Sequence, residues 1–437
     1  MKVCILGAGE SGVGAAILAK VQGLGVFVSD FGKISGSYKS ELEKYNIEYE
    51  EEKHTEGEIL TADLVIKSPG IPDKAPIVKK LKSVNIEIID EIEFGFRQLK
   101  IKSPSTQIIA ITGSNGKTTT TKLTYNLFKS AGFNVAIGGN IGQSFAKQVA
   151  MCDVDFYVLE ISSFQLDYCF DFRPNVGILI NISPDHLDRY EYKMTNYIAS
   201  KFRITQSQTE SDLFIYNTEN EPMLNWLKVK KIAAKMVGIS SDNFKADYIK
   251  VNESRFNKSD LTIQGPHNYF NASCAIAAAK SCGISDEAIL KGLQTFENEP
   301  HRMEFVRTYR EVDYINDSKA TNIDAVKYAL MAIKKPIAWI VGGIDKGNDY
   351  DVIRMLVEEK VSNMICLAAD DSKFKAAFPN LYKEGQSAKT AKDAVEIAAN
   401  IAKEGDVVLL SPACSSFDLF ENYMQRGDLF REAVNEM

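Results

Sequence analysis

The segment between residues 108 and 120 constrains this chain more than any other. The apolar, β-branched run Ile108-Ile-Ala-Ile111 leads into Gly113-Ser-Asn-Gly-Lys-Thr-Thr-Thr120, and this order predicts a strand, a loop and a helix. Successive backbone N–H groups at such a helix start form a concavity that suits phosphate. We expect Lys117 to reach the outer phosphates of a nucleotide and the Thr118 hydroxyl to contact Mg²⁺.

The match to the general phosphate-loop motif covers only the second half of that motif. The motif begins with a glycine six residues before the lysine, and Ile111 occupies this position. A glycine-rich turn that opens an ordinary helix is therefore the alternative, although Gly-Lys-Thr after an apolar strand is a demanding combination. The segment predicts a chain that hydrolyses a nucleoside triphosphate or transfers its phosphate.

A second glycine-rich turn lies near the N-terminus. Gly7-Ala-Gly9-Glu-Ser-Gly12 follows an apolar strand at 3–7, and Asp30 ends the next predicted strand, 25–29. This arrangement is the dinucleotide-binding fingerprint of a strand–helix–strand unit. Three interpretations remain open at this turn: a site for a nucleotide diphosphate of some kind, a site for NAD, and a purely structural turn.

Polar residues follow further strands in the middle of the chain. Glu160 closes the apolar strand 156–160, where a buried carboxylate is costly, so we expect it to hold Mg²⁺ directly or through water. A helix cap or a surface charge is the alternative. His186 follows the next apolar strand, and either a loop hydrogen bond or a contact to metal or substrate would explain it. Lys201 lies on a predicted helix, 194–208, and its spacing alone predicts a solvated lysine.

The last third of the chain alternates strands and helices, and three of its polar loops follow strands. The first loop, 317–322, contains an Asp and a Lys. The second, 342–347, contains a Lys, and the third, 411–418, contains two adjacent Ser residues. Because loops after parallel strands meet at one edge of a sheet, they predict a site for a carboxylate, although each alone could be a mere turn. Upstream, Asn268 and Asn271 could cap a helix or contact an adenine edge.

Length and composition limit the class of protein. A chain of 437 residues is too long for one core, so we expect domains at 1–97, 98–299 and 300–437, with a polar linker at 98–106. The net charge of −7 and pI ≈ 5.4 argue against a nucleic-acid partner. No apolar run approaches the length of a membrane span, and seven scattered cysteines are typical of reduced thiols in a cytoplasmic protein.

Together these motifs resemble those of the Mur ligases, and the resemblance covers nearly the whole chain. The family's central loop reads Thr-Gly-(Ser/Thr)-Asn-Gly-Lys-Thr-Thr, which Thr112–Thr119 reproduces, and this accounts for the missing first glycine. Within the family, Asn316–Asn322, Ser68–Ile71 and Ser411–Cys414 resemble the members that add D-glutamate. Members that add other residues have Asp-Tyr-(Ala/Gly)-His-type segments in place of Asp317-Ser-Lys319.

The resemblance implies an α/β fold of three domains: a Rossmann-like N-terminal domain, a central P-loop ATPase-like domain and a Rossmann-like C-terminal domain. It implies an ATP-dependent ligase that adds D-glutamate to UDP-N-acetylmuramoyl-L-alanine through an acyl phosphate, in cytoplasmic peptidoglycan precursor synthesis. The cofactors would be ATP and Mg²⁺ at two sites. We expect the chain to bind these two small-molecule substrates and no nucleic acid. We also expect it to be a monomer that does not insert into a membrane.

The resemblance also implies roles for individual residues around ATP. The nucleotide would contact the phosphate loop and three residues further along the chain: Gly113, Ser114, Asn115, Gly116, Lys117, Thr118, Thr119, Asn271, Arg302 and Asp317. Thr118 and Glu160 would hold the first metal. His186 and Lys201 correspond to ligands of a second metal, with Lys201 carbamylated, which overturns the interpretation of Lys201 as solvated. The implied catalytic set is Lys117, Glu160, His186 and Lys201.

Other positions would bind the remaining substrates. The UDP part would contact the N-terminal domain at Ser11, Asp30, Ser68 and Gly70, and the rest of that substrate would contact Asn140 and His186. The D-glutamate pocket would be formed by Lys319, Thr321, Lys346, Ser416, Phe417 and Tyr423. One departure is Glu10, an acid beside a supposed diphosphate, which is acceptable there only if its side chain points outward.

Three alternatives to this function remain. The ligase could add another amino acid, as a related Mur-type or polyglutamate-type enzyme. The turn at Gly7–Gly12 could instead belong to an NAD-dependent dehydrogenase, or the phosphate loop to a nucleotide switch without catalytic activity. The polar C-terminal loops argue against the switch.

Overall fold

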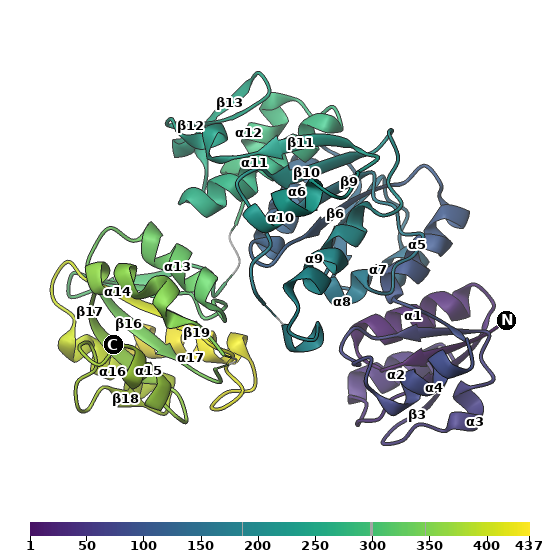
Figure 1. The fold of residues 1–437 in the computed structure, drawn as a ribbon, viewed down its shortest axis with the longest axis horizontal. Helices are drawn as coiled ribbons and strands as arrows, with labels where there is room; N and C mark the ends of the chain where they lie inside the picture. Colours follow the sequence, from purple (N-terminus) through teal and green to yellow (C-terminus); the bar gives the residue numbers. More distant parts are fainter. Residues whose placement is uncertain (186, 298–299, 346) are drawn as a thin grey trace. The chain divides into compact units, whose positions relative to one another are not determined.

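The computed structural model describes residues 1–185, 187–297, 300–345 and 347–437. Helices and mostly parallel strands alternate along the chain, which confirms the predicted α/β class. The chain divides into two units, drawn in Figure 1: unit 1 is Met1–Thr262 with Asn268–Phe296, and unit 2 is Ile263–His267 with Glu297–Met437. None of the helices in the described ranges is long and apolar enough to cross a membrane.

The first sheet of unit 1 has five parallel strands in the order β3-β2-β1-β4-β5. Its strands are β1 (Lys2–Leu6), β2 (Gly25–Ser29), β3 (Glu48–Glu50), β4 (Leu64–Lys67) and β5 (Glu87–Ile89). The connecting helices are α1 (Glu10–Val21), α2 (Gly36–Lys44), α3 (Glu56–Ile59) and α4 (Pro76–Ser83). The strand order reverses between β1 and β4, and open α/β sheets bind ligands at such a reversal.

Helix α5 (Glu91–Lys102) occupies part of the predicted linker at 98–106, so that prediction is wrong as far as residue 102. Ile92, Phe96 and Leu99 are buried at i, i+4 and i+7. The polar residues that suggest a linker therefore lie on the other face of an amphipathic helix. The predicted domain boundary falls inside this helix and stays a prediction.

Helix α7 (Phe145–Met151) packs directly against α1 and α5. An added Cβ at Gly14 of α1 would lie 2.0 Å from Ser144 Oγ, and one at Gly95 of α5 would lie 2.7 Å from Phe145 Cδ1. These distances leave room for glycine but not for a side chain. Because the helices approach so closely, one hydrophobic cluster extends from the first sheet into the second sheet of unit 1.

The second sheet of unit 1 has six parallel strands in the order β11-β10-β9-β6-β8-β7. Its strands are β6 (Gln107–Thr112), β7 (Val135–Gly139), β8 (Phe156–Glu160), β9 (Val176–Leu179), β10 (Leu213–Asn217) and β11 (Lys235–Ile239), and β12 (Tyr248–Val251) forms a separate hairpin with β13 (Ser254–Asn257). The remaining helices of this part are α6 (Lys117–Ser130), α8 (Ser163–Leu166), α9 (Met194–Phe202), α10 (Glu221–Leu227), α11 (Pro266–Ser281) and α12 (Asp286–Gln294). The predicted helix 194–208 is shorter than expected, since a 3₁₀ turn at Arg203–Thr205 follows α9.

Unit 2 contains one sheet in the order β14-β15-β19-β16-β17-β18, in which only the β14–β15 pair is antiparallel within the described residues. Its strands are β14 (Glu304–Tyr309), β15 (Val312–Asn316), β16 (Ile337–Gly342), β17 (Val361–Leu367), β18 (Ser387–Ala388) and β19 (Val407–Ala413). Its helices are α13 (Ile323–Ala332), α14 (Arg354–Lys360), α15 (Ser372–Ala377), α16 (Ala391–Ile401) and α17 (Tyr423–Glu436). Because β15, β19 and β16 are adjacent and parallel, the three polar loops that follow them share one edge of the sheet.

Candidate active site

Strand β6 runs into the predicted phosphate loop, and α6 begins at Lys117. Gly116 caps this helix with φ +85°, a left-handed conformation that favours glycine. An added Cβ at Gly116 would lie 2.7 Å from Asn271 Oδ1. The structure therefore brings the Asn271 amide of α11 against the loop, although the two are far apart in sequence.

Two lysines converge on the same loop. Lys117 Nζ donates hydrogen bonds to the carbonyl oxygens of Gly113 (2.8 Å) and Ser114 (2.9 Å). Lys201 Nζ also donates to the Gly113 carbonyl, over 2.9 Å, and lies 4.6 Å from the centre of the Tyr197 ring. Lys201 is only 2% exposed, so the solvated lysine predicted from spacing is wrong.

Burial changes the acid–base chemistry of Lys201. Loss of solvation lowers its pKa well below the ordinary value for lysine, and the positive charge of Lys117 acts in the same direction. A lowered pKa increases the share of unprotonated amine, which is the nucleophilic form. The buried side chain follows from helix orientation, because the face that carries Met194, Tyr197 and Lys201 packs inward.

Glu160 ends β8 beside the start of the phosphate loop, because β8 pairs with β6 so that Glu160 lies opposite Ile111. Its Oε1 atom accepts a hydrogen bond from Asn140 Nδ2 (2.9 Å), and its backbone carbonyl accepts one from the Asn140 N–H (2.8 Å). Its Oε2 atom is buried and has no hydrogen-bond partner among the described residues. A buried carboxylate oxygen without a partner fits a hard cation such as Mg²⁺.

The chain offers few ligands for such a cation. Within the described ranges, no group of three or more His, Cys, Asp or Glu side chains could hold a metal ion. Proteins usually bind Mg²⁺ through one or two carboxylates, with waters and substrate phosphates as the other ligands. The Glu160 carboxylate and the Thr118 hydroxyl therefore fit a nucleotide-bound Mg²⁺. The predicted ligand His186 and the predicted pocket residue Lys346 lie outside the described residues.

The predicted UDP-binding residues gather at the strand reversal of the first sheet. Asp30 Oδ2 accepts a hydrogen bond from the Ala8 N–H (2.6 Å). Ser68 Oγ donates a long hydrogen bond (3.5 Å) to the Gly7 carbonyl. Ser11 lies in the first turn of α1, next to this loop. The structure thus brings the turn after β1 together with Asp30 and Ser68.

Glu10 is the acidic residue that does not fit the expected diphosphate turn. Its side chain makes a contact with the segment before α7. Its Oε1 atom accepts a hydrogen bond from the Ser144 N–H (2.9 Å) just before α7. Glu10 therefore contributes to the contact between α1 and α7, which weakens the charge objection to Ser11 as a diphosphate contact. Gly70 lies in the loop after β4, and a Cβ added there would meet no other atom within 4 Å.

In unit 2, Asp317 follows β15 and is buried. Its carboxylate accepts hydrogen bonds from the Met303 N–H (3.1 Å) and from the Ser411 hydroxyl (2.9 Å). Burial raises the pKa of Asp317 to about 7, and the positive charge of Arg302 opposes this shift. The structure therefore places the charge of Arg302 close enough to Asp317 to affect its pKa.

Of the predicted D-glutamate residues that the structure describes, four lie on loops at the shared edge of the unit 2 sheet, and Tyr423 begins α17. Lys319 Nζ lies 5.5 Å from the centre of the Tyr423 ring, a cation–π distance. The Thr321 N–H donates to the Lys319 carbonyl over 3.0 Å. Ser416 is buried, whereas Phe417 is 65% exposed. Lys319 and Tyr423 are thus brought together from positions about a hundred residues apart in the sequence.

Sequence reasoning missed Arg426, which connects these loops. Its guanidinium donates to the Ser318 hydroxyl (3.0 Å) and carbonyl (2.7 Å), and to the carbonyls of Gly342 (3.4 Å) and Cys414 (3.2 Å). These acceptors lie at the C-terminal ends of β15, β16 and β19. Arg426 is 1% exposed, and burial lowers its pKa to about 10. A signal was present in the sequence, because Arg426 shares a helical face with apolar Phe430.

Three family models match the chain: the MurD N-terminal domain at residues 2–77, the Mur ligase middle domain at 111–279, and the Mur ligase, glutamate ligase domain at 301–414. A relative from Cytophaga hutchinsonii, named UDP-N-acetylmuramoylalanine–D-glutamate ligase, is 46% identical over 448 residues and covers 100% of this chain and 99% of its own. A relative of the same name from Christiangramia forsetii is 46% identical over 447 residues, with coverage of 100% and 99%.

Solved structures share the fold at lower sequence identity. The UDP-N-acetylmuramate–alanine ligase of Thermotoga maritima has a TM-score of 0.62 and 20% identity, covering 100% of this chain and 99% of its own. The MurF ligase of Thermotoga maritima in complex with ADP has a TM-score of 0.60 and 14% identity, covering 87% and 91%. At these identities the likeness shows the fold alone. The matching family models and the full-length relatives show that this chain belongs to the Mur ligase family.

Proposed function

We propose that this chain is an ATP-dependent ligase that joins D-glutamate to UDP-N-acetylmuramoyl-L-alanine in peptidoglycan precursor synthesis. The observation that carries the proposal is the convergence of Lys117 and Lys201 on the Gly113 carbonyl, in the same sheet-edge region as the unpartnered Glu160 oxygen. Such an arrangement of charges suits phosphoryl transfer. The identity of the substrates is supported by relatives of that name with 46% identity over the whole chain.

The reaction must activate a carboxylate before an amine can attack it. A carboxylate oxygen of the L-alanyl group attacks the γ-phosphorus of ATP, the bond to the β,γ-bridging oxygen breaks, and ADP leaves. The D-glutamate nitrogen then attacks the acyl-phosphate carbonyl and forms a tetrahedral intermediate. Collapse of this intermediate expels phosphate, and the nitrogen loses a proton. The amide forms at the expense of one ATP.

Unit 1 contains the residues proposed for ATP and the UDP substrate. The loop N–H groups and Lys117 would hold the phosphates and balance negative charge on the transferring group. Asn271, packed against Gly116, would contact the nucleotide, and we propose that role for Arg302 and Asp317 of unit 2 as well. The first sheet would bind the UDP part through Ser11, Asp30, Ser68 and Gly70, and Asn140 would contact the rest of that substrate.

We propose two Mg²⁺ sites. Thr118 and Glu160 would hold the first ion, which fits the unpartnered Oε2 atom of Glu160. His186 and a carbamylated Lys201 would hold the second. Bound Mg²⁺ would neutralise negative charge on the phosphate groups. Carbamylation would join the Lys201 nitrogen to the carbon of CO₂ with release of a proton, and the buried amine with its lowered pKa supports this step.

The loops of unit 2 would bind D-glutamate. Lys319, Lys346 and the Ser416 hydroxyl would contact its carboxylates, while Thr321, Phe417 and Tyr423 would complete the pocket. The cation–π contact of Lys319 with Tyr423 supports a fixed position for the ammonium group. We further propose a monomeric cytoplasmic enzyme, and sedimentation of the purified chain tests the monomer.

A coupled assay of ADP and phosphate release tests the proposed function. We expect turnover when ATP, UDP-N-acetylmuramoyl-L-alanine and D-glutamate are all present, and none when any one of them is omitted. Equal turnover with L-glutamate, or turnover without an amino acid, would contradict the proposal. Turnover with a different amino acid instead of D-glutamate would favour a related ligase of the same family.

A further inference from the structure

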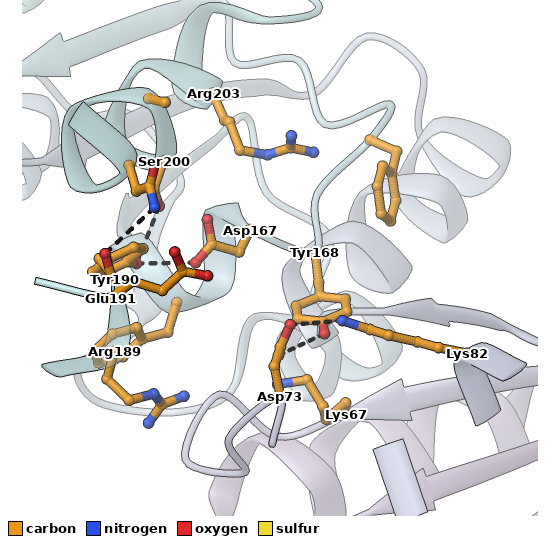
Figure 2. Close-up of a pocket in the computed structure, with 14 residues that line it drawn as sticks. Lys67, Asp73, Lys82, Asp167, Tyr168, Arg189, Tyr190, Glu191, Ser200 and Arg203 are labelled. Atoms are coloured by element: carbon orange, nitrogen blue, oxygen red, sulfur yellow. Dashed lines mark hydrogen bonds and ion pairs between the residues drawn. The ribbon is translucent and has the colours of Figure 1, made fainter. Parts of the chain in front are cut away.

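A cavity of about 640 Å³ lies within unit 1, and none of its lining residues has a role assigned above (Figure 2). One side of the cavity is formed by the end of β4 and by α4. The other side is formed by α8, the loop after α8, the turn at Leu187–Arg189 and α9. Its volume falls within the range of small-molecule sites. Figure 2 shows Lys67, Asp73 and Lys82 gathered beside Tyr168, with the other labelled side chains around the remaining walls.

Among the described residues, three cations of this cavity have no carboxylate partner in an ion pair. Lys67 Nζ donates to the Ile71 carbonyl (2.8 Å), Arg189 Nη2 to the Pro69 carbonyl (3.3 Å), and Arg203 to backbone carbonyls next to the cavity. Among the residues that the structure describes, none of these three cations forms an ion pair. Lys67 is only 2% exposed, and a buried charge is costly unless an opposite charge accompanies it.

The carboxylates of the cavity each have a donor of their own. The contacts are Asp73 with Lys82 (2.7 Å) and Tyr168 (2.6 Å), Asp167 with Tyr190 (2.9 Å), and Glu191 with Lys193 (2.8 Å). Burial lowers the pKa of Lys67 and raises the pKa of Asp167 relative to their ordinary values. Asp167 has only neutral hydroxyl donors within the described part of the chain, so its carboxylate is the one negative charge there that faces the three cations outside an ion pair. The excess charge of this cavity is still positive, in a chain whose net charge is −7.

Aromatic rings hold the three cations in place. The distances from charge to ring centre are 4.3 Å for Lys67 over Tyr168, 4.4 Å for Arg189 over Phe164 and 5.4 Å for Arg203 over Phe170. Cations that are already fixed lose less conformational entropy when a ligand binds. The cavity is thus prepared for an anion rather than merely lined by mobile side chains.

We propose that this cavity binds a small molecule that carries a diphosphate group. Three cations outside ion pairs, set against the single carboxylate of Asp167, leave more positive charge than one further carboxylate would balance. Two arginine guanidinium groups also match the geometry of phosphate oxygens. The volume leaves room for a further group attached to the diphosphate. Aromatic walls suit such a group, which can be a nucleoside.

The cavity also touches the loop after β4 that we propose for UDP binding. Lys67 and Arg189 donate to the Ile71 and Pro69 carbonyls, which lie next to Ser68 and Gly70 in that loop. A bound diphosphate would compete for these donors, so we expect it to raise the KM for the UDP substrate at least twofold. This coupling rests on the proposed function, whereas binding of the diphosphate does not.

Calorimetric titration with pyrophosphate tests the site. Saturating ADP and UDP are present throughout, so that ADP occupies the phosphate loop and UDP occupies the proposed site on the first sheet. We expect one further equivalent of pyrophosphate to bind, and Arg189→Gln to weaken this binding at least tenfold. Asn196→Asp, which adds a negative charge to the cavity with almost no change in size, has the same expected effect and tests the site if Arg189→Gln does not fold. Arg255→Gln is the matched control, because Arg255 is exposed, stacks on Tyr248 and lies outside the cavity.

A parallel titration with UDP alone separates a nucleoside-borne diphosphate from the free ion. If the cavity prefers a nucleoside diphosphate, a second equivalent of UDP binds to the wild type and is lost in Arg189→Gln. Absence of both extra equivalents in the wild type, or equal weakening by Arg255→Gln, would overturn the proposal. An unchanged KM with pyrophosphate bound would refute the coupling, whereas absence of any D-glutamate-dependent turnover would refute the proposed function and leave the binding result standing.

Discussion

Lys117 and Lys201 donate hydrogen bonds to one acceptor, the Gly113 carbonyl oxygen, over 2.8 and 2.9 Å. Lys117 begins the helix of the phosphate loop, and Lys201 lies on α9. The positive charge of Lys117 so close by disfavours the charged form of Lys201, in the same direction as burial. Lys117 thus supplies positive charge at the phosphate loop, whereas the Lys201 amine is shifted toward its unprotonated form.

Replacement of Lys201 by alanine is expected to reduce turnover by roughly 10²–10³-fold, the range for loss of an electrostatic group at a reaction centre. If a carbamate is the functional form, small carboxylic acids added to Lys201→Ala will restore part of the activity. Steady-state ADP release measures both effects. Lys193→Ala is the matched control, because Lys193 is exposed and pairs with Glu191; wild-type turnover of Lys201→Ala would contradict the proposed role.

Replacement of Glu160 by glutamine keeps the size of the side chain and removes its charge. We expect the Mg²⁺ concentration for half-maximal activity to rise at least tenfold, because the unpartnered oxygen would lose its anionic character. A Mg²⁺ titration of activity at saturating ATP measures this shift. Glu253→Gln, at an exposed position, should leave the titration unchanged, and an equally unchanged curve for Glu160→Gln would rule out a metal ligand.

Replacement of Arg426 by alanine is expected to raise the KM for D-glutamate at least tenfold, with a much smaller change for ATP. Arg426 connects the ends of β15, β16 and β19 through hydrogen bonds. Its loss leaves the carbonyls of Ser318, Gly342 and Cys414 without this donor and removes the link between the loops. Added guanidinium should restore part of the affinity for D-glutamate. Arg431→Ala on the same helix, which pairs with Asp428 near the surface, is the control. Equal rises in both KM values would contradict a role confined to the D-glutamate loops, whereas a fall in kcat with unchanged KM values would indicate general unfolding.

Asp317 makes the stability of the chain depend on pH. Its folded pKa of about 7 lies above its ordinary value of 3.8, so the folded state binds its proton more tightly than the unfolded state does. The ionised form is penalised, and stability is therefore lost as pH rises from about 4 to about 7, by at most about 4 kcal/mol. Asp317→Asn should flatten the fall in Tm across this range.

Thermal unfolding at several pH values checks this expectation. Asp351→Asn provides the control, because Asp351 lies in the same unit with its side chain 75% exposed. A curve for Asp317→Asn that runs parallel to the wild type would mean that other groups dominate the dependence. Glu91 contributes in the same direction, since burial raises its pKa to about 7 as well, so the difference between variants is the relevant quantity.

The sequence alone determined where the chemistry-bearing loops lie. A Gly-Lys-Thr segment after an apolar strand predicts a phosphate loop, because its glycine allows the tight turn that exposes N–H groups at the helix start and its lysine adds a positive charge there. Glu160 ends a strand of unit 1, and the segments at Asp317 and Ser411 follow or end strands of unit 2. Within each sheet, parallel strands bring their C-terminal ends to one edge. These relationships depend on local periodicity and on topology, which a sequence records directly.

The tertiary structure decided which side chains are buried and what they contact. Spacing along α9 predicted a solvated Lys201, yet the packing of that helix turns it onto the Gly113 carbonyl. Arg426 carries no motif, and its partners come from three loops that only the folded sheet brings together. Helix periodicity defines a face but not what packs against it, and that choice depends on elements far away in the chain. The contacts that the buried side chains of Lys201, Arg426 and Lys67 make are therefore visible only in the folded chain.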